Sequence, residues 1–218
     1  RFDGLRLDAV HAIATPGAPH VLHDISMAVG ELARDTGRHI HLVLENDDNG
    51  ARFLAPGEDP PHGHYRAQWN DDNHHDWHVR LPGEKQGYYK DYADPERLIA
   101  RTLADGFAYQ GESSAHRNGA PRGEPSKTLP PLAFVDFLQN HDQIGNRALG
   151  ERLAALAPPS QLEAALIVLL LSPSIPLLFM GDEWGARSPF PFFCDFAGEL
   201  ADAVRNGRKA EFSEAYAD

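Results

Sequence analysis

The stretch GLRLDAVHAI, residues 4–13, is an apolar run that carries one arginine and one aspartate two positions apart. Successive side chains of a β-strand point to opposite faces, so Arg6 and Asp8 would share a face. The stretch HIHLVLEND, residues 39–47, is again rich in leucine and β-branched residues, and it contains Glu45 where its apolar run ends. Both stretches predict strands with acidic side chains at their carboxyl ends.

A helix is expected between these two strands. Leu22, Ile25 and Val29 recur at helical spacing after turn residues at 15–17, and Gly37 is placed to end the helix. Strand, helix and strand within 50 residues form a βαβ unit, and continuous apolar strands between helices predict a parallel sheet covered on both faces. The sequence therefore predicts an α/β fold.

The rest of the chain alternates in a similar way. An irregular region is expected at about residues 50–130, with a long surface loop over 110–130 because that stretch has little apolar content. Further strands are expected within residues 64–71, 132–142 and 174–185, the last of them buried, and further helices over 91–106, 161–171 and 196–214, the last one broken by Gly207.

The composition limits the classes of function. The 218 residues are 42% hydrophobic and 24% charged, as in an ordinary globular protein. The formal net charge of −12 argues against nucleic acid, whose phosphates are bound by clustered Lys and Arg. The longest apolar run, residues 164–171, is too short for a membrane span. We therefore expect a cytoplasmic protein without nucleic-acid or membrane partners, and the single Cys194 as a buried or partly buried core thiol.

Each predicted strand ends in polar side chains. In a barrel of parallel strands the carboxyl ends open onto one face, and that face holds the active site. Several carboxylates would then converge there, and a pair of carboxylates is what glycoside hydrolysis needs. The groups are Asp8, Glu45-Asn46-Asp47, Asn70-Asp71, Asn140-His141-Asp142 and Asp182-Glu183.

Each group also has a simpler interpretation on its own. Arg6 and Asp8 could form a structural ion pair, and Asp142 could be the N-cap of a helix. Glu45 and the residues NDDN after it could be a solvated acidic turn. The coincidence of three independent strands that end in this way weakens these interpretations.

Two other residue types allow a binding role. His74 and His78 are four apart and could face one metal ion on a helix, but no HExxH pattern accompanies them, so a metal site is not expected. Trp69 and Trp184 flank predicted strand ends and could offer stacking faces to sugar rings, with core packing as the alternative role.

The stretches GLRLDAVHAI, HLVLENDDN and FLQNHDQIGNRALGERL resemble motifs of the alpha-amylase superfamily, glycoside hydrolase family 13. The resemblance covers nearly the whole chain and is weakest over residues 110–130. It implies that the chain is the carboxy-terminal part of a (β/α)8 TIM barrel, strands 4 to 8 with their helices. Strands 1–3 and the amino- and carboxy-terminal β domains of the family would be absent, so we expect the chain alone to be inactive.

The resemblance also implies roles for single residues. Asp8 matches the catalytic nucleophile, Glu45 the general acid and base, and Asp142 the third catalytic carboxylate, which binds sugar hydroxyls. Arg6 matches the arginine that keeps the nucleophile ionised, and His141 matches a sugar-binding histidine. The other residues expected to contact substrate are His11, Asn46, Asp47, Gln68, Trp69, Asn70, Asp71 and Trp184.

The implied activity is the retaining hydrolysis of an α-1,4-glucosidic bond, without a cofactor. The stretches QWNDDNHHDWH and MGDEWGARSPFPFFCDFAGELADAVRNGRKAEF are similar to members of the superfamily that release trehalose from malto-oligosaccharides ending in trehalose. The synthase that forms this substrate would then be a functional partner. A branching enzyme of the same superfamily is the nearest alternative, and a non-catalytic carbohydrate-binding remnant is the alternative from another class.

Overall fold

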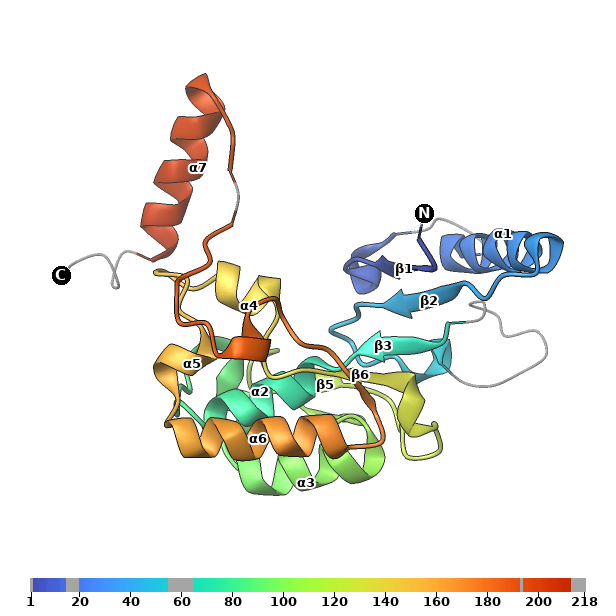
Figure 1. Ribbon diagram of the computed structural model, residues 1–218, viewed down its shortest axis with the longest axis horizontal. Helices are drawn as coiled ribbons and strands as arrows, with labels where there is room; N and C mark the ends of the chain where they lie inside the picture. The colour runs from blue at the N-terminus through green and yellow to red at the C-terminus, as the bar shows by residue number, and fades with distance from the viewer. Residues whose placement is uncertain (1, 15–19, 55–64, 193, 213–218) are drawn as a thin grey trace.

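The computed structural model describes residues 2–14, 20–54, 65–192 and 194–212 (Figure 1). A parallel sheet of five strands runs through it, and the strands stand in the order in which they occur along the chain. Each strand pairs in parallel with the next one. The expected α/β class and the parallel sheet are confirmed. The strands are β1 (Gly4–Leu7), β2 (His41–Leu44), β3 (Ala67–Trp69), β6 (Phe134–Asp136) and β7 (Ile175–Pro176).

Helices fill most of the connections between these strands. The helix expected after β1 is present as α1, and Gly37 ends it in the left-handed conformation with φ 65°. The turn expected at 15–17 lies outside the described residues. In Figure 1, α2, α3 and α6 lie together below β6, whereas α7 projects away from the sheet. The helices are α1 (Val21–Thr36), α2 (Asp71–Arg80), α3 (Pro95–Asp105), α4 (His141–Gly145), α5 (Leu153–Leu156), α6 (Pro159–Leu171) and α7 (Gly198–Glu211), with short 3-10 helices η1 (Val10–Ala12), η2 (Ala51–Phe53), η3 (Gly87–Tyr92), η4 (Pro131–Ala133) and η5 (Asp182–Trp184).

The largest core cluster lies between the sheet and its helices. Leu22 of α1 and Leu44 of β2 are fully buried and belong to one cluster with Phe107 and Phe134. Burying a side chain of this size stabilises the fold by about 1.5–3 kcal/mol. The rings of Phe107 and Phe134 meet edge to face at 5.1 Å. Gly106 permits this packing, because its φ is +94° and an added Cβ would lie 2.1 Å from the ring of Phe134.

The last strand of the sheet differs from its expectation. Residues 174–185 were expected to hold a buried strand, but β7 covers only Ile175–Pro176 and both residues are exposed. The reason is its place at the edge of the sheet, where β6 covers one flank and no strand of the described residues covers the other. Met180, farther along the same apolar run, is 59% exposed.

The region 110–130 is mostly exposed, as its low apolar content predicts, but it is more ordered than a simple loop. It contains an antiparallel hairpin of β4 (Glu112–Ser113) and β5 (Pro121–Arg122), and the Arg122 side chain is only 4% exposed. The reason is that the hairpin buries paired polar groups rather than apolar ones, so composition alone does not reveal it. Residues 55–64 of the irregular region lie outside the described part of the chain.

The helices differ from expectation in smaller ways. The helix expected at 91–106 begins at Pro95, because proline favours the first turn of a helix. The last helix, α7, continues through Gly207, since one exposed glycine costs only about 1 kcal/mol in a helix. Cys194, just before α7, is exposed rather than buried, because this segment lies outside the core clusters. Among the described residues, no helix combines the length and the apolar character that a membrane crossing requires.

Candidate active site

The carboxyl ends of β1 and β2 and the start of α4 surround a pocket of about 370 Å³, here called the carboxylate pocket. Its wall includes seven residues that the sequence singles out: Asp8, His11, Glu45, Asp47, Asp71, His141 and Asp142. A larger cavity of about 890 Å³ lies between α7 and the segment before it, and among the described residues no carboxylate lines that cavity. Four of the five predicted polar groups bring a carboxylate to the carboxylate pocket, whereas Asp182 and Glu183 do not line it.

Arg6 joins two carboxyl groups of this pocket. Its Nη1 donates to Asp8, and its Nη2 lies 2.7 Å from Oε1 of Glu45. The other oxygen of Glu45 accepts the backbone N–H of Ala9 at 2.9 Å. Ala9 can reach it because the chain turns after β1, where Ala9 has a positive φ of 42°. Arg6 and Asp8 thus form the ion pair considered for the sequence, and Glu45 extends it.

The two carboxyl groups have pKa values that are displaced in opposite directions. A hydrogen bond from Glu45, followed by the contacts with Arg6, holds the pKa of Asp8 below its usual range. Burial raises the pKa of Glu45, against the Ala9 N–H and Arg6, which lower it. Asp8 is therefore the ionised partner of the pair and Glu45 is the partner that retains its proton to higher pH.

A short helix brings Asp142 and His141 to the same pocket. Asn140 is the N-cap of α4, since its side-chain oxygen accepts the N–H of Asp142 at 2.8 Å and that of Gln143 at 3.4 Å. The Gln143 side chain accepts the N–H of Asn140 in return, which completes a capping box. The N-cap role considered for Asp142 is therefore wrong. Asp142 lies in the first turn instead, where its Oδ1 accepts a hydrogen bond from Asn146 at 2.8 Å.

Asp47 and Asp71 are held in opposite charge states on the pocket wall. Burial works to raise the pKa of Asp47, but Arg122 and Arg117 outweigh it and the pKa is lowered. Burial raises the pKa of Asp71 to about 8, although Arg122 favours its ionised form. Asp71 therefore carries a proton at neutral pH, whereas Asp47 is ionised. The N–H of Asp47 also donates to Nδ1 of His11 at 3.2 Å.

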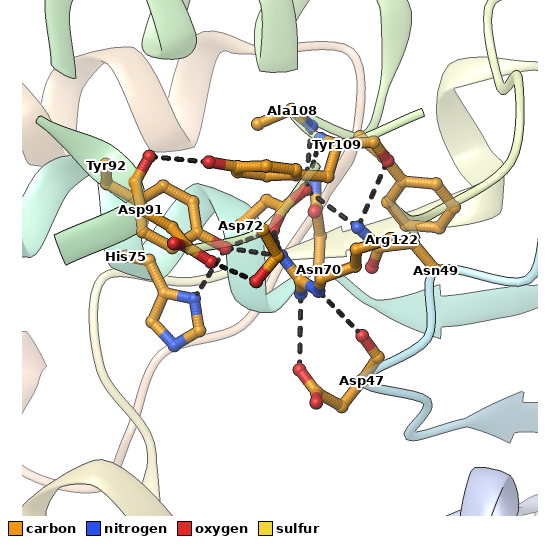
Figure 2. Close-up of polar contacts among 12 residues, drawn as sticks. Asp47, Asn49, Asn70, Asp72, His75, Asp91, Tyr92, Ala108, Tyr109 and Arg122 are labelled. Carbon is orange, nitrogen blue, oxygen red and sulfur yellow. Dashed lines mark hydrogen bonds and ion pairs between the residues drawn. The ribbon is translucent and has the colours of Figure 1, made fainter. Parts of the chain in front are cut away.

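A second arginine fastens the 110–130 region to this pocket. Figure 2 shows Arg122 between Asp47 and Asp72, and its Nη1 donates to Asp72 at 2.6 Å. Asp72 is fully buried in α2 and also accepts the N–H groups of Ala108 and Tyr109 at 2.8 and 3.0 Å. We refer to Asp47, Asp72, Tyr92 and Arg122 as the Arg122 cluster. Its hydrogen bonds place the β4–β5 hairpin against the end of β2.

Sequence reasoning missed much of the pocket wall. The missed residues come from α2, η3, the β4–β5 hairpin and α4, and Arg117 among them donates to Asp47 and Asp48, each at 2.6 Å. The available signal was a pair of arginines, Arg117 and Arg122, in a stretch with almost no apolar residues to bury. The missed wall residues are Ala9 in the turn after β1 and His75, Tyr88, Asp91, Tyr92, Ser114, His116, Arg117, Arg122 and Gln143.

Arg6 and five other residues expected to contact substrate do not line the pocket. Asn46, Gln68 and Asn70 are buried and bond to the protein itself: Gln68 donates to the carbonyl of Asn46 at 3.1 Å, and Asn70 to that of Gly106 at 3.0 Å. Trp184 is 75% exposed in η5. The fifth residue is Trp69, whose ring lies against the guanidinium of Arg6.

The histidines of α2 are occupied by hydrogen bonds. The helix that would align His74 with His78 is present, but Nδ1 of His74 lies 2.6 Å from the carbonyl of Leu138 and Nε2 lies 2.9 Å from the Tyr89 hydroxyl. Nε2 of His78 contacts Glu84 at 2.7 Å. Among the described residues, no group of three or more His, Cys, Asp or Glu side chains is arranged to hold a metal ion.

The geometry of Asp8 and Glu45 suits one kind of chemistry. An ionised carboxylate beside a protonated one can attack an acetal carbon while the acid protonates the leaving oxygen. Both carboxyl groups contact the guanidinium of Arg6, so they lie side by side at the pocket. A retaining mechanism requires two carboxyl groups that lie close together in this way.

Comparisons with known proteins agree with this chemistry. No protein-family model matches the chain. Malto-oligosyltrehalose trehalohydrolase of Mycobacterium tuberculosis is 43% identical over 216 residues, which are 97% of this chain and 37% of that protein. The protein of the same name from Saccharolobus solfataricus is 39% identical over 210 residues, or 96% of this chain and 36% of that protein.

A solved structure is similar over the same extent. The crystal structure of a protein assigned as an alpha amylase in Salmonella typhimurium superposes with a TM-score of 0.92 and 50% sequence identity, and the match covers 99% of this chain and 37% of that one. The chain spans little more than a third of the length of the curated relatives that it matches. Over that extent, the chain is similar in sequence to these trehalohydrolases and in fold to this alpha-amylase structure.

Proposed function

We propose that the chain is the part of a malto-oligosyltrehalose trehalohydrolase that carries the catalytic carboxylates. The whole protein would hydrolyse the α-1,4-glucosidic bond next to the terminal trehalose unit of malto-oligosyltrehalose and release trehalose. The observation that carries this proposal is the pair of Asp8 and Glu45, joined by Arg6 and displaced in pKa in opposite directions. The names of the curated relatives support the choice of substrate.

The mechanism follows from the charge states of the pair. The scissile bond lies across Asp8 and Glu45, and protonated Glu45 donates its proton to the leaving oxygen of the trehalose unit. Ionised Asp8 attacks the anomeric carbon and forms a glycosyl-enzyme. Glu45, now a base, activates water that releases the remaining glucan with retained configuration. Arg6 stabilises the charge on Asp8, and His141 and Asp142 bind sugar hydroxyls at the pocket wall.

The fold proposal is that β1, β2, β3, β6 and β7 are strands 4 to 8 of a (β/α)8 barrel. Parallel pairing in chain order supports it, as does a free outer flank on both β1 and β7 among the described residues. The chain would then be the carboxy-terminal part of the barrel, with an irregular insertion at about residues 50–130. Strands 1–3 and the amino- and carboxy-terminal β domains would belong to the rest of the protein.

The setting proposed for this activity is the cytoplasm. The protein would act on the product of a malto-oligosyltrehalose-forming synthase and would need no cofactor. Related α-glucans would be its other ligands, and the net charge of −12 argues against nucleic acid as a partner.

The test uses the full-length protein that carries this chain. It is incubated with maltotriosyl-trehalose and with a malto-oligosaccharide of equal length, and the products are followed by chromatography. We expect free trehalose from the first substrate and little cleavage of the second. Glu45→Gln should abolish both reactions, whereas Glu163→Gln, an exposed carboxyl on α6, should change neither.

Other outcomes assign other functions. Equal cleavage of both substrates, or branched products, would contradict the trehalohydrolase and point to another enzyme of the family, such as a 1,4-α-glucan branching enzyme. Binding of both glucans without cleavage by a folded protein would point to a non-catalytic carbohydrate-binding role.

A further inference from the structure

Trp69 occupies an unusual place for a residue expected to stack on sugar. It ends β3, and the guanidinium carbon of Arg6 lies 4.1 Å from the centroid of its ring. Phe137 and His141 approach the same ring edge to face, with centroids at 5.6 and 5.9 Å. Trp69 is not part of the carboxylate pocket wall, so its contacts are with protein side chains.

Arg6 needs such a support. It starts on β1, pairs in register with Val43 of β2, and reaches the end of β3, so its side chain crosses the intervening strand. Its Nε is buried and has no hydrogen-bond partner among the described residues. The guanidinium therefore contacts Asp8 and Glu45 through its terminal nitrogens, while its carbon lies over the Trp69 ring.

The two carboxylates alone would not fix this position. The Asp8 side chain is 77% exposed, so it can move into solvent and take Arg6 with it. A cation over an aromatic face is attracted to the ring, most strongly when water is excluded, and the Arg6 side chain is largely buried.

We infer that Trp69 is a positioning residue, which holds Arg6 between Asp8 and Glu45 and does not serve as a sugar-stacking surface. The inference rests on the proposed function, because it assigns a role within the same site. It predicts that loss of the ring changes the ionisation of the carboxylate pair rather than the affinity for substrate.

A residue that positions Arg6 and a residue that stacks on sugar affect the pH dependence of kcat/KM differently. Arg6 lowers the pKa of both Asp8 and Glu45, so a displaced Arg6 moves both limbs of the pH profile of kcat/KM toward higher pH. The other titratable groups that face the pair are Asp71 from α2 and His141 from α4, and His141 also contacts the Trp69 ring. His141 lowers the pKa of Asp8, so its displacement would move the Asp8 limb, whereas a displaced Arg6 moves both limbs. Loss of a stacking surface would raise KM and leave both limbs in place.

The experiment compares Trp69→Leu and Trp69→Phe with wild type in the full-length protein. We expect Trp69→Leu to lower kcat by about tenfold, to leave KM within about twofold and to shift both limbs upward. Trp69→Phe retains a smaller aromatic face, so it should recover part of each change. Trp77→Leu and Trp77→Phe are matched controls, because Trp77 packs against the Leu81 and Leu138 cluster and does not line the pocket. A rise in KM with unmoved limbs, or no change in any variant, would overturn the inference.

A second measurement does not depend on activity. If Trp69 holds Arg6, the decreases in the unfolding midpoint caused by Arg6→Ala and Trp69→Leu overlap, and the double variant loses less than their sum. Additive decreases would contradict the positioning role. A wild-type protein that cleaves no α-glucan would refute the proposed function, whereas the overlap would still decide the contact between Arg6 and Trp69.

Discussion

Arg6 and Arg122 each join two carboxylates at or beside the carboxylate pocket, as Arg117 also does, and the groups held by Arg6 and Arg122 differ in accessibility. Arg6 joins Asp8 and Glu45, and the Asp8 side chain is 77% exposed. Arg122 joins Asp47 and Asp72, and Asp72 is fully buried with hydrogen bonds to both of its oxygens. The group formed by an arginine and two carboxylates is therefore accessible at Arg6. The corresponding group at Arg122 is largely buried and holds two parts of the fold together.

This difference separates catalysis from stability. A carboxylate that faces a pocket can react, because substrate can reach it and its charge is balanced by only one neighbour. A buried carboxylate with several donors cannot leave its partners without a large free-energy cost. Substitutions at the first arginine site should act on turnover, and substitutions at the second should act on the free energy of unfolding.

The largest expected effect is loss of turnover in Asp8→Asn. An amide cannot attack the anomeric carbon, so we expect kcat to fall by about 10²–10⁴-fold, at least as much as loss of a general acid would cause. The free energy of unfolding should change by less than about 1 kcal/mol, because an exposed ion pair contributes little. Steady-state kinetics and denaturant unfolding measure the two quantities. Retained turnover in Asp8→Asn would assign the nucleophile to another residue.

The next effect is a loss of stability in Arg122→Met. This substitution leaves Asp72 buried without its cation, which costs about 3–5 kcal/mol in the free energy of unfolding. The double variant Arg122→Met/Asp72→Asn should recover part of that loss. Arg97→Met is the matched control, because Arg97 and Asp94 form an exposed ion pair worth about 0.5 kcal/mol. Equal losses in the two single variants would remove the distinction between the two arginine sites.

A third prediction concerns Asp76, one helical turn from Asp72 but without a cation of its own. Burial raises the pKa of Asp76 to about 9, from a usual value of 3.8. Thr102 donates to one of its oxygens at 2.8 Å, and the other oxygen has no hydrogen-bond partner among the described residues. Between about pH 4 and pH 9 the folded protein therefore binds a proton that the unfolded chain lacks, so this group destabilises the fold as pH rises.

Asp76→Asn should remove this pH dependence. The free energy of unfolding of the variant, relative to wild type, should rise by about 2.7 kcal/mol between pH 5 and pH 7. Urea unfolding at a series of pH values measures the difference, with Asp202→Asn on the exposed face of α7 as control. A constant difference across this range would show that Asp76 is ionised in the folded protein and paired in a way that the structure does not contain.

Local patterns predicted the open site because its determinants lie close together in the chain. Arg6 and Asp8 are two positions apart on one strand, and Glu45 ends the next strand, so strand periodicity and parallel pairing were sufficient to bring them together. The alternation of strands and helices predicted the sheet for the same reason. These features depend on a few neighbouring residues, and the sequence shows them directly.

The Arg122 cluster could not be predicted in this way. Arg122 and Asp72 are 50 residues apart, and Asp72 lies in a helix with a polar buried face, so no apolar periodicity marks it. Trp69 was placed correctly at a strand end, but its contact with Arg6 crosses β2 and depends on the sheet as a whole. Pairings between distant polar groups are tertiary information, which composition and periodicity do not contain.

The smallest expected effect is at Trp184, which was expected to contact substrate because it flanks a predicted strand end and which the structure places outside the carboxylate pocket. Its side chain is 75% exposed in η5, and none of the aromatic or cationic contacts of the described residues involves it. Trp184→Ala should therefore change the free energy of unfolding by less than about 0.5 kcal/mol. KM for malto-oligosyltrehalose should stay within about twofold of wild type, since truncation removes no wall of the pocket. A tenfold rise in KM would show that substrate extends beyond this pocket to the end of β7. The substrate-binding site would then be larger than the carboxylate pocket around Arg6.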